Sequence, residues 1–191
     1  LFRSDIYKKT FSSMDRSVVH SSTFSQNDMA MVAGLAALAV LKDEKLIENA
    51  ERMGKLFIEL CTPLKDKYEM LHDVRGKGLM VGFEFGKPKS MSLSMGWKMV
   101  HTADKNLFPQ MIVIPLFEKH KILTQVAGHN MDIIKLLPTL TITEADVRSF
   151  VTAFDSVLAE CHKFPGSMWD ITAKLAKAAM TQKVESSSAP L

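Results

Sequence analysis

The most hydrophobic stretch of the chain covers residues 29–41, where every position is apolar. A helix without a polar face is expected to be buried on all sides. This one is too short to span a bilayer, which needs about 20 residues. Gly34 and the many alanines give this helix small side chains, so neighbouring elements can pack close to its backbone. Ser25 and Asp28, placed just before it, predict N-terminal capping of the helix.

Residues 43–68 show an amphipathic pattern, in which apolar side chains recur at steps of three and four. The apolar positions are Leu46, Ile47, Ala50, Met53, Phe57, Leu60 and Leu64. Pro63 is expected to bend or divide this helix near its end. Its length is typical of a helix that bridges two lobes.

From residue 70 onward, strand and helix patterns are interleaved. Residues 79–85 alternate with a period of two, and a glycine-containing turn at 75–78 joins them to a strand over 70–74. The next predicted elements are helices over 91–106 and 109–120 and short strands over 122–126 and 133–137. Two further helices follow, one capped by Thr143 and Asp146 and the last capped by Ser167 and Asp170. The inward face of the first of these two consists of Val147, Phe150, Val151, Phe154 and Leu158. This order predicts an α/β or α+β lobe.

Charge and cysteine content narrow the functional classes. The formal net charge of +3 is small and scattered, which argues against a nucleic-acid partner. Cys61 and Cys161 lack metal-ligand spacing and lie in helical patterns, so we expect buried free thiols in a reducing cytoplasm. The sequence shows no metal site, signal peptide or membrane-spanning segment. Residues 1–11 read as mid-protein sequence, so we expect the chain to begin inside a longer polypeptide.

A run of hydroxyl side chains, Ser21, Ser22 and Thr23, comes just before the apolar helix. Free N–H groups, the positive end of the helix dipole and hydroxyl donors converge at such a turn, and together they can hold a phosphate. The alternative is that the Thr23 hydroxyl bonds only to local backbone groups.

Three short patches resemble the class III aminotransferases, which are fold-type I enzymes that use pyridoxal 5'-phosphate (PLP). HSSTF at residues 20–24 with Asn27 is similar to the family's H-x-x-T-F-x-x-N stretch, VRGKGLM at 74–80 to its V-R-G-x-G-L-M turn, and LPTLTIT at 137–143 to its P-P-L-T-I-T segment. Each patch alone is a weak signal. Their shared order and spacing, over most of the first 160 residues, make the resemblance specific.

The resemblance implies that PLP is bound by a lysine Schiff base in the family's large domain. That lysine lies upstream of the matched part, and no S-K-x-x-x-G-G stretch occurs here, so no catalytic residue is assigned within this chain. In the family, the threonine of H-x-x-T-F reaches the PLP phosphate of the partner subunit. The resemblance therefore implies that Thr23, with Ser22, binds the cofactor in a homodimer with a shared active site.

One position departs from the family pattern. Many members carry an arginine three residues before the proline of P-P-L, where it grips the substrate carboxylate, and this chain has Lys135 there. Lysine offers a point charge instead of a bidentate fork. If Lys135 contacts the substrate, a terminal amine, an ω-amino acid or an aldehyde acceptor is favoured over an ordinary α-amino acid. The alternative is a lysine that snorkels at the end of a strand.

For Arg75, a contact with a carbonyl or with Asp73 is favoured over substrate binding.

Together, these features assign residues 1–42 to the end of a PLP-binding large domain, 43–69 to a bridging helix, 70–180 to a C-terminal α+β small domain and 181–191 to a frayed tail. The expected fold is an α/β, fold-type I PLP-dependent transferase. The expected activity is amino transfer between an amine donor and a carbonyl acceptor, an aldehyde or a keto acid, with an upstream N-terminal half. The alternatives are an aminomutase or decarboxylase of the same family, and a non-catalytic interaction or dimerisation domain.

Overall fold

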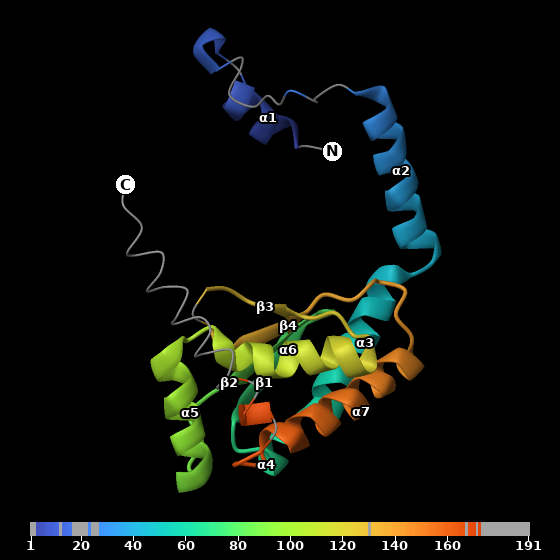
Figure 1. The fold of residues 1–191 in the computed structure, drawn as a ribbon. Coiled ribbons are helices and arrows are strands. Elements are labelled where there is room, and N and C mark those ends of the chain that lie inside the picture. Colours follow the sequence, from blue (N-terminus) through green and yellow to red (C-terminus); the bar gives the residue numbers. More distant parts are fainter. Residues whose placement is uncertain are drawn as a thin grey trace. The chain divides into compact units, whose positions relative to one another are not determined.

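The computed structural model describes residues 3–11, 13–16, 23, 27–129, 131–166, 168–170 and 172 of the chain. The chain divides into two compact units, residues 1–44 and residues 45–191. The described part of the first unit is helical, and the second unit contains the strands (Figure 1).

The first unit contains α1 (Ser4–Phe11), the 3-10 helix η1 (Met14–Arg16) and α2 (Asp28–Asp43). The N-cap of α2 is Asn27, whose side-chain oxygen accepts a hydrogen bond from the Ala30 N–H. The prediction of Ser25 as the cap was therefore wrong by two residues, and Ser25 itself lies outside the described residues. Asn is as good an N-cap as Ser, because its short side chain also reaches an unpaired N–H of the first turn.

Helix α2 has no buried residue, which contradicts the prediction of a helix buried on all sides. Met29 is 84% exposed and Leu35 is 68% exposed. The physical reason is that an apolar helix becomes buried only where other elements cover it. The described residues of the first unit form only the short helices α1 and η1 besides α2, and these do not bury it.

The second unit combines helices with one antiparallel sheet. Its elements are α3 (Leu46–Cys61), α4 (Leu64–Lys67), β1 (Leu71–Lys77), β2 (Met80–Phe85), α5 (Met91–Ala103), α6 (Leu107–His120), β3 (Gln125–Val126), β4 (Ile133–Leu136) and α7 (Glu144–Cys161). The amphipathic segment predicted over 43–68 forms two helices, and Pro63, at the N-cap of α4, marks the division as predicted. The apolar side chains on its inward face, Met53 and Phe57, are buried against the rest of the unit.

The sheet has the strand order β1-β2-β4-β3, and its described neighbours are all antiparallel. The predicted hairpin is confirmed: β1 and β2 pair from Leu71–Phe85 to Lys77–Met80 around a tight turn. Gly78 in this turn has a φ of 54°, a left-handed conformation that glycine adopts without a steric penalty. The strand predicted over 122–126 is shorter in the structure, since only Gln125 and Val126 pair with β4.

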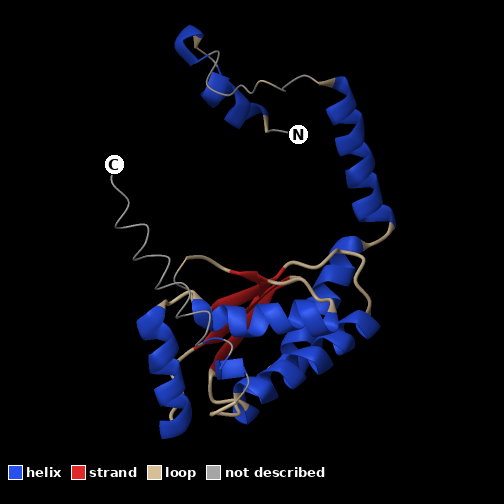
Figure 2. Ribbon diagram, viewed as in Figure 1, coloured by secondary structure: helices blue, strands red, loops and turns tan. Residues whose placement is uncertain are grey.

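One face of the sheet forms the core with the helices, and Figure 2 shows α6 and α7 lying across it. Phe83 of β2 contacts the rings of Phe150 and Phe154 on α7, at centroid distances of 5.8 and 4.6 Å. Phe57 of α3 contacts Phe150 edge-on at 5.6 Å. Edge and offset contacts of this kind add to the hydrophobic stabilisation of a core. The alternating strand pattern therefore puts apolar residues against helices and leaves the other positions on the opposite face.

Helix α7 begins with the predicted capping box. The Thr143 hydroxyl accepts from the Asp146 N–H, while the Asp146 carboxylate accepts from the Thr143 N–H. The predicted cap at Ser167 and the tail over 181–191 lie outside the described residues. Among the helices that the structure describes, none is both long enough and apolar enough to cross a membrane.

Candidate functional site

Thr23 is the described residue of the predicted phosphate turn, and Ser22 lies outside the described residues. Thr23 is in a turn, and its side chain is exposed. An exposed hydroxyl shortly before a helix N-terminus fits a hydrogen-bond donor to a PLP phosphate. The two cavities described below are lined by residues of the second unit. The role of Thr23 in cofactor binding therefore stays a prediction.

Lys135 lies in β4 on the sheet face opposite the helices. It is directly opposite Gly82 of β2 on one side and Gln125 of β3 on the other. Its side chain is half-buried. Within the described residues it makes no hydrogen bond or ion pair, so its ammonium charge is uncompensated there. The absence of a side chain at Gly82 leaves space beside the lysine.

Arg75 occupies the same face and has a different environment. It donates hydrogen bonds to Asp73, at 2.9 Å, and to Glu84. These carboxylates raise the pKa of Arg75, and its guanidinium in turn lowers the pKa of Asp73. Lys65 adds a further contact to Asp73 at 3.4 Å. The predicted structural contact between Arg75 and Asp73 is confirmed. Because the Arg75 guanidinium is paired with two carboxylates, it is poorly suited to bind a substrate anion.

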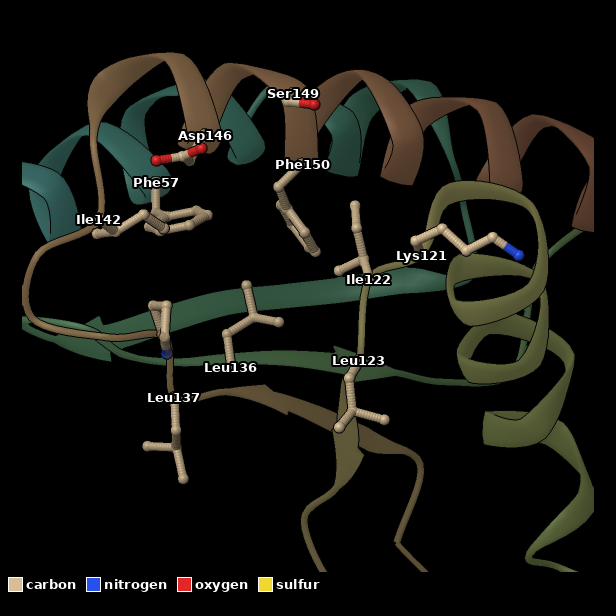
Figure 3. Close-up of a pocket in the computed structure, with 11 residues that line it drawn as sticks. Phe57, Lys121, Ile122, Leu123, Leu136, Leu137, Ile142, Asp146, Ser149 and Phe150 are labelled. Carbon is tan, nitrogen blue, oxygen red and sulfur yellow. The ribbon is translucent and has the colours of Figure 1, made fainter.

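A cavity of about 340 Å³ opens between the sheet and the start of α7 (Figure 3). Its wall is largely apolar and includes Phe57, Leu136 and Phe150. The Lys121 ammonium in Figure 3 turns away from Phe150, and it donates to the Glu118 carbonyl at 2.9 Å. Since the Asp146 carboxylate is engaged in the capping box, this cavity lacks converging groups for acid–base chemistry.

A second cavity, of about 700 Å³, lies between α3 and the hairpin turn. Its lining includes Ile47, Ile58 and Leu140, and the Glu51–Lys55 ion pair, 2.7 Å long, also borders it. Ile47 is 68% exposed. This second cavity is an apolar groove, and its lining does not bring together groups for catalysis. Within the part of the chain that the structure describes, no group of three or more His, Cys, Asp or Glu side chains could hold a metal ion.

Two histidines make defined contacts that the sequence did not reveal. His101 of α5 lies 2.9 Å from the Asp132 carboxylate, through its Nε2. His162, which follows α7, accepts the Met70 N–H through its Nε2 at 3.3 Å. Both contacts join positions far apart in the chain, so no local motif signals them.

Most of the amino-acid sequence matches the model of a known protein family. A family model described as aminotransferase class-III matches residues 2–158. The aminotransferase PigE from Serratia sp. is 27% identical over 184 residues, which is 81% of this chain and 22% of that protein. A mitochondrial alanine–glyoxylate aminotransferase 2 homologue from Arabidopsis thaliana is 31% identical over 134 residues, which is 70% of this chain and 26% of that protein.

Solved structures give the same result. An amine transaminase from an uncultivated Pseudomonas species, in its PLP-bound form, aligns with a TM-score of 0.67 at 25% identity and covers 84% of this chain. Acetylornithine aminotransferase from Elizabethkingia anophelis aligns with a TM-score of 0.54 at 32% identity and covers 74% of this chain. The chain spans 34% and 32% of those two structures, and only about a quarter of the curated relatives above.

Proposed function

The chain belongs to the class III aminotransferases and has the fold of fold-type I PLP enzymes, and from this premise we propose that it is the C-terminal portion of a PLP-dependent aminotransferase. The whole enzyme would move an amino group between an amine donor and an aldehyde or keto-acid acceptor. The observation that carries this proposal is the family match over residues 2–158. The Schiff-base lysine would come from a portion of the enzyme outside this chain.

In this proposal, residues 1–42 end the large domain, residues 43–69 connect the domains, residues 70–180 form the small domain and residues 181–191 are a tail. The exposed apolar surface of α2 supports the first assignment, because such a helix gains stability when the rest of a large domain covers it. The division of the structure between residues 44 and 45 is compatible with this boundary.

We further propose that Thr23 and Ser22 bind the cofactor phosphate of the partner subunit in a homodimer. Bound PLP supplies an electron sink for chemistry at the substrate's amine-bearing carbon. The Thr23 hydroxyl would donate a hydrogen bond to a phosphate oxygen and so orient the cofactor. The small domain would close over the substrate and exclude water from the reaction.

Lys135 is the proposed substrate contact. Its half-buried and uncompensated ammonium on the sheet face supports the attraction of an anionic or polar group. A lysine holds a carboxylate less specifically than a bidentate arginine does. We therefore propose terminal amines, ω-amino acids and aldehydes as the first substrate classes to examine.

The cytoplasm is the proposed location. Cys61 and Cys161 are both free and buried, as predicted, and unpaired cysteines are typical of reducing compartments.

The phosphate role is tested by the substitution Thr23→Ala in the full-length enzyme. We expect weaker retention of PLP during dialysis, because a hydrogen bond to a charged group contributes about 1.5–3 kcal/mol. Thr10→Ala is the matched control, since Thr10 is an exposed threonine of the same unit whose hydroxyl donates to the Ile6 carbonyl of its own helix. Retention that is equal in both variants would contradict the role of Thr23.

A further inference from the structure

Both ring nitrogens of His101 face hydrogen-bond acceptors. Nδ1 lies 3.0 Å from the carbonyl oxygen of Trp97, and Nε2 lies 2.9 Å from a carboxylate oxygen of Asp132. A neutral imidazole carries only one N–H, so it can donate to only one of these acceptors. The doubly protonated imidazolium donates to both. The geometry therefore fits the cationic form of His101.

The aromatic surroundings of His101 also favour a cation. The Trp97 ring stacks on the imidazole at a centroid distance of 4.2 Å and an interplanar angle of 20°. The ring of Phe108, in α6, also stacks on the His101 imidazole, at a centroid distance of 5.9 Å. The faces of aromatic rings carry negative potential and attract cations. Lys105, in the turn between α5 and α6, is the charged group that opposes protonation.

Asp132 depends on His101 for its compensation. Its Oδ2 contacts His101, while its Oδ1 is buried and has no hydrogen-bond partner among the described residues. A carboxylate oxygen that is removed from water costs free energy unless a donor or a cation compensates it. The imidazolium supplies both a hydrogen bond and an opposite charge to the Asp132 carboxylate.

Asp132 also connects this pair to the sheet. Its carbonyl oxygen accepts the Phe85 N–H of β2 at 2.8 Å, and β4 starts at the next residue. His101 lies near the end of α5, a helix whose main packing partner among the described elements is α6. The contact between His101 and Asp132 is therefore a direct tie between the end of α5 and the entry of β4.

We propose that His101 is held as an imidazolium in the folded protein, and that with Asp132 it forms a proton-dependent clamp between α5 and the start of β4. When the proton leaves, one of the two hydrogen bonds is lost and the Asp132 charge becomes uncompensated. The contact between the end of α5 and the start of β4 is then weaker. This inference stands independently of the proposed enzymatic function.

His162 provides an internal comparison. Its Nε2 accepts the Met70 N–H at 3.3 Å, and its Nδ1 lies 2.9 Å from the Leu158 carbonyl. One nitrogen must accept and the other can donate, which a neutral ring satisfies. Burial lowers the pKa of His162. For His101 burial also favours the neutral form, but the hydrogen bonds with Asp132 and Trp97 prevail and raise its pKa above the ordinary 6.5.

The test is a pH titration of the histidine ring nitrogens by NMR on the uniformly 15N-labelled full chain. Single His→Gln variants assign the signals of His101 and His162. We expect both nitrogens of His101 to be protonated at pH 6.5, with a pKa above 6.5, whereas His162 titrates below 6.5 as a ring protonated on Nδ1. Asp132→Asn keeps the size of the side chain and removes its charge, so it should lower the pKa of His101 and leave that of His162 in place.

Two results would overturn the clamp: a His101 that titrates at or below 6.5, or a His101 titration that Asp132→Asn does not move. Because both histidines are followed in the same wild-type sample, the first criterion holds even if Asp132→Asn fails to fold.

Discussion

Lys135 lies directly opposite Gly82 in the antiparallel pairing of β4 with β2, and Gly82 lies opposite Arg75 on its other side. Neighbouring strands are about 4.8 Å apart, so the two cationic residues are separated by about 10 Å across a position without a side chain. Arg75 is compensated by Asp73 and Glu84, while Lys135 has no partner among the described residues. An anionic substrate group would therefore be drawn to the lysine.

Lys135→Met in the full-length enzyme tests this role. We expect the KM of a carboxylate-bearing acceptor to rise about tenfold or more, because a charged hydrogen bond contributes about 1.5–3 kcal/mol. Lys135→Arg should keep or lower that KM, since the guanidinium can bind the carboxylate with two hydrogen bonds. Lys87→Met, at an exposed loop position, is the matched control. A KM that Lys135→Met leaves unchanged would favour the snorkelling lysine.

Gly54 and Gly78 show how closely α3 approaches the hairpin turn. A Cβ at Gly54 would lie 2.1 Å from the Gly78 carbonyl oxygen, whereas a Cβ at Gly82 would meet its nearest atoms at 3.9 Å. Gly54→Ala should therefore lower the free energy of unfolding by about 1–3 kcal/mol or more, because backbone must move to admit the methyl group. Chemical denaturation should show this loss for Gly54→Ala and little change for Gly82→Ala. Equal stabilities would mean that the helix and the turn are not in contact.

The hairpin and α7 could be predicted because their signals are local. The two-residue alternation of β2 fixes which side chains face the helices, and Thr143 and Asp146 cap α7 from within one turn. Phe150 and Phe154 recur at helical spacing, and both are buried as predicted. Local patterns of this kind determine an element's type and its inward face whatever its neighbours are.

Other features depend on distant parts of the chain and could not be predicted. The apolar pattern of α2 correctly indicated a helix but not its exposure, since burial is decided by what packs against it. His101 and Asp132 are 31 positions apart and meet only because α5 ends near the entry of β4. At the candidate site, the resemblance to the family indicated Lys135, but the open position at Gly82 follows from the strand register alone.

Cys61 and Cys161 should be unreactive in the folded protein. Burial raises the pKa of each thiol to about 12, so the nucleophilic thiolate is scarce at neutral pH. A thiol reagent such as DTNB should modify both cysteines rapidly in denaturant and very slowly without it. Rapid modification of the native protein at pH 7.5 would contradict the burial of these helices against the core.

The contributions of His101 and His162 to stability should depend on pH in opposite directions. The raised pKa of His101 means that its contribution is fully present below 6.5 and is lost as the pH rises through the folded-state pKa. The lowered pKa of His162 means that its contribution is present above 6.5 and is lost as the pH falls through the folded-state pKa.

Denaturation curves between about pH 5 and pH 9 measure this difference. His101→Gln should cost more stability at the acidic end than at the basic end. His162→Gln should show the reverse order, and it serves as the matched control at a partly buried histidine. Parallel pH profiles for the two variants would contradict the assigned protonation states.

Whether this chain completes a PLP-dependent aminotransferase is tested most directly by visible spectroscopy. The chain is purified alone and together with the polypeptide encoded immediately upstream, PLP is added, and spectra are recorded before and after an ω-amine donor. We predict a Schiff-base absorption band only in the combined sample, and its disappearance when the amine is added. If neither sample shows the band while the chain alone is folded and dimeric, the catalytic assignment is contradicted and a non-catalytic interaction domain is favoured.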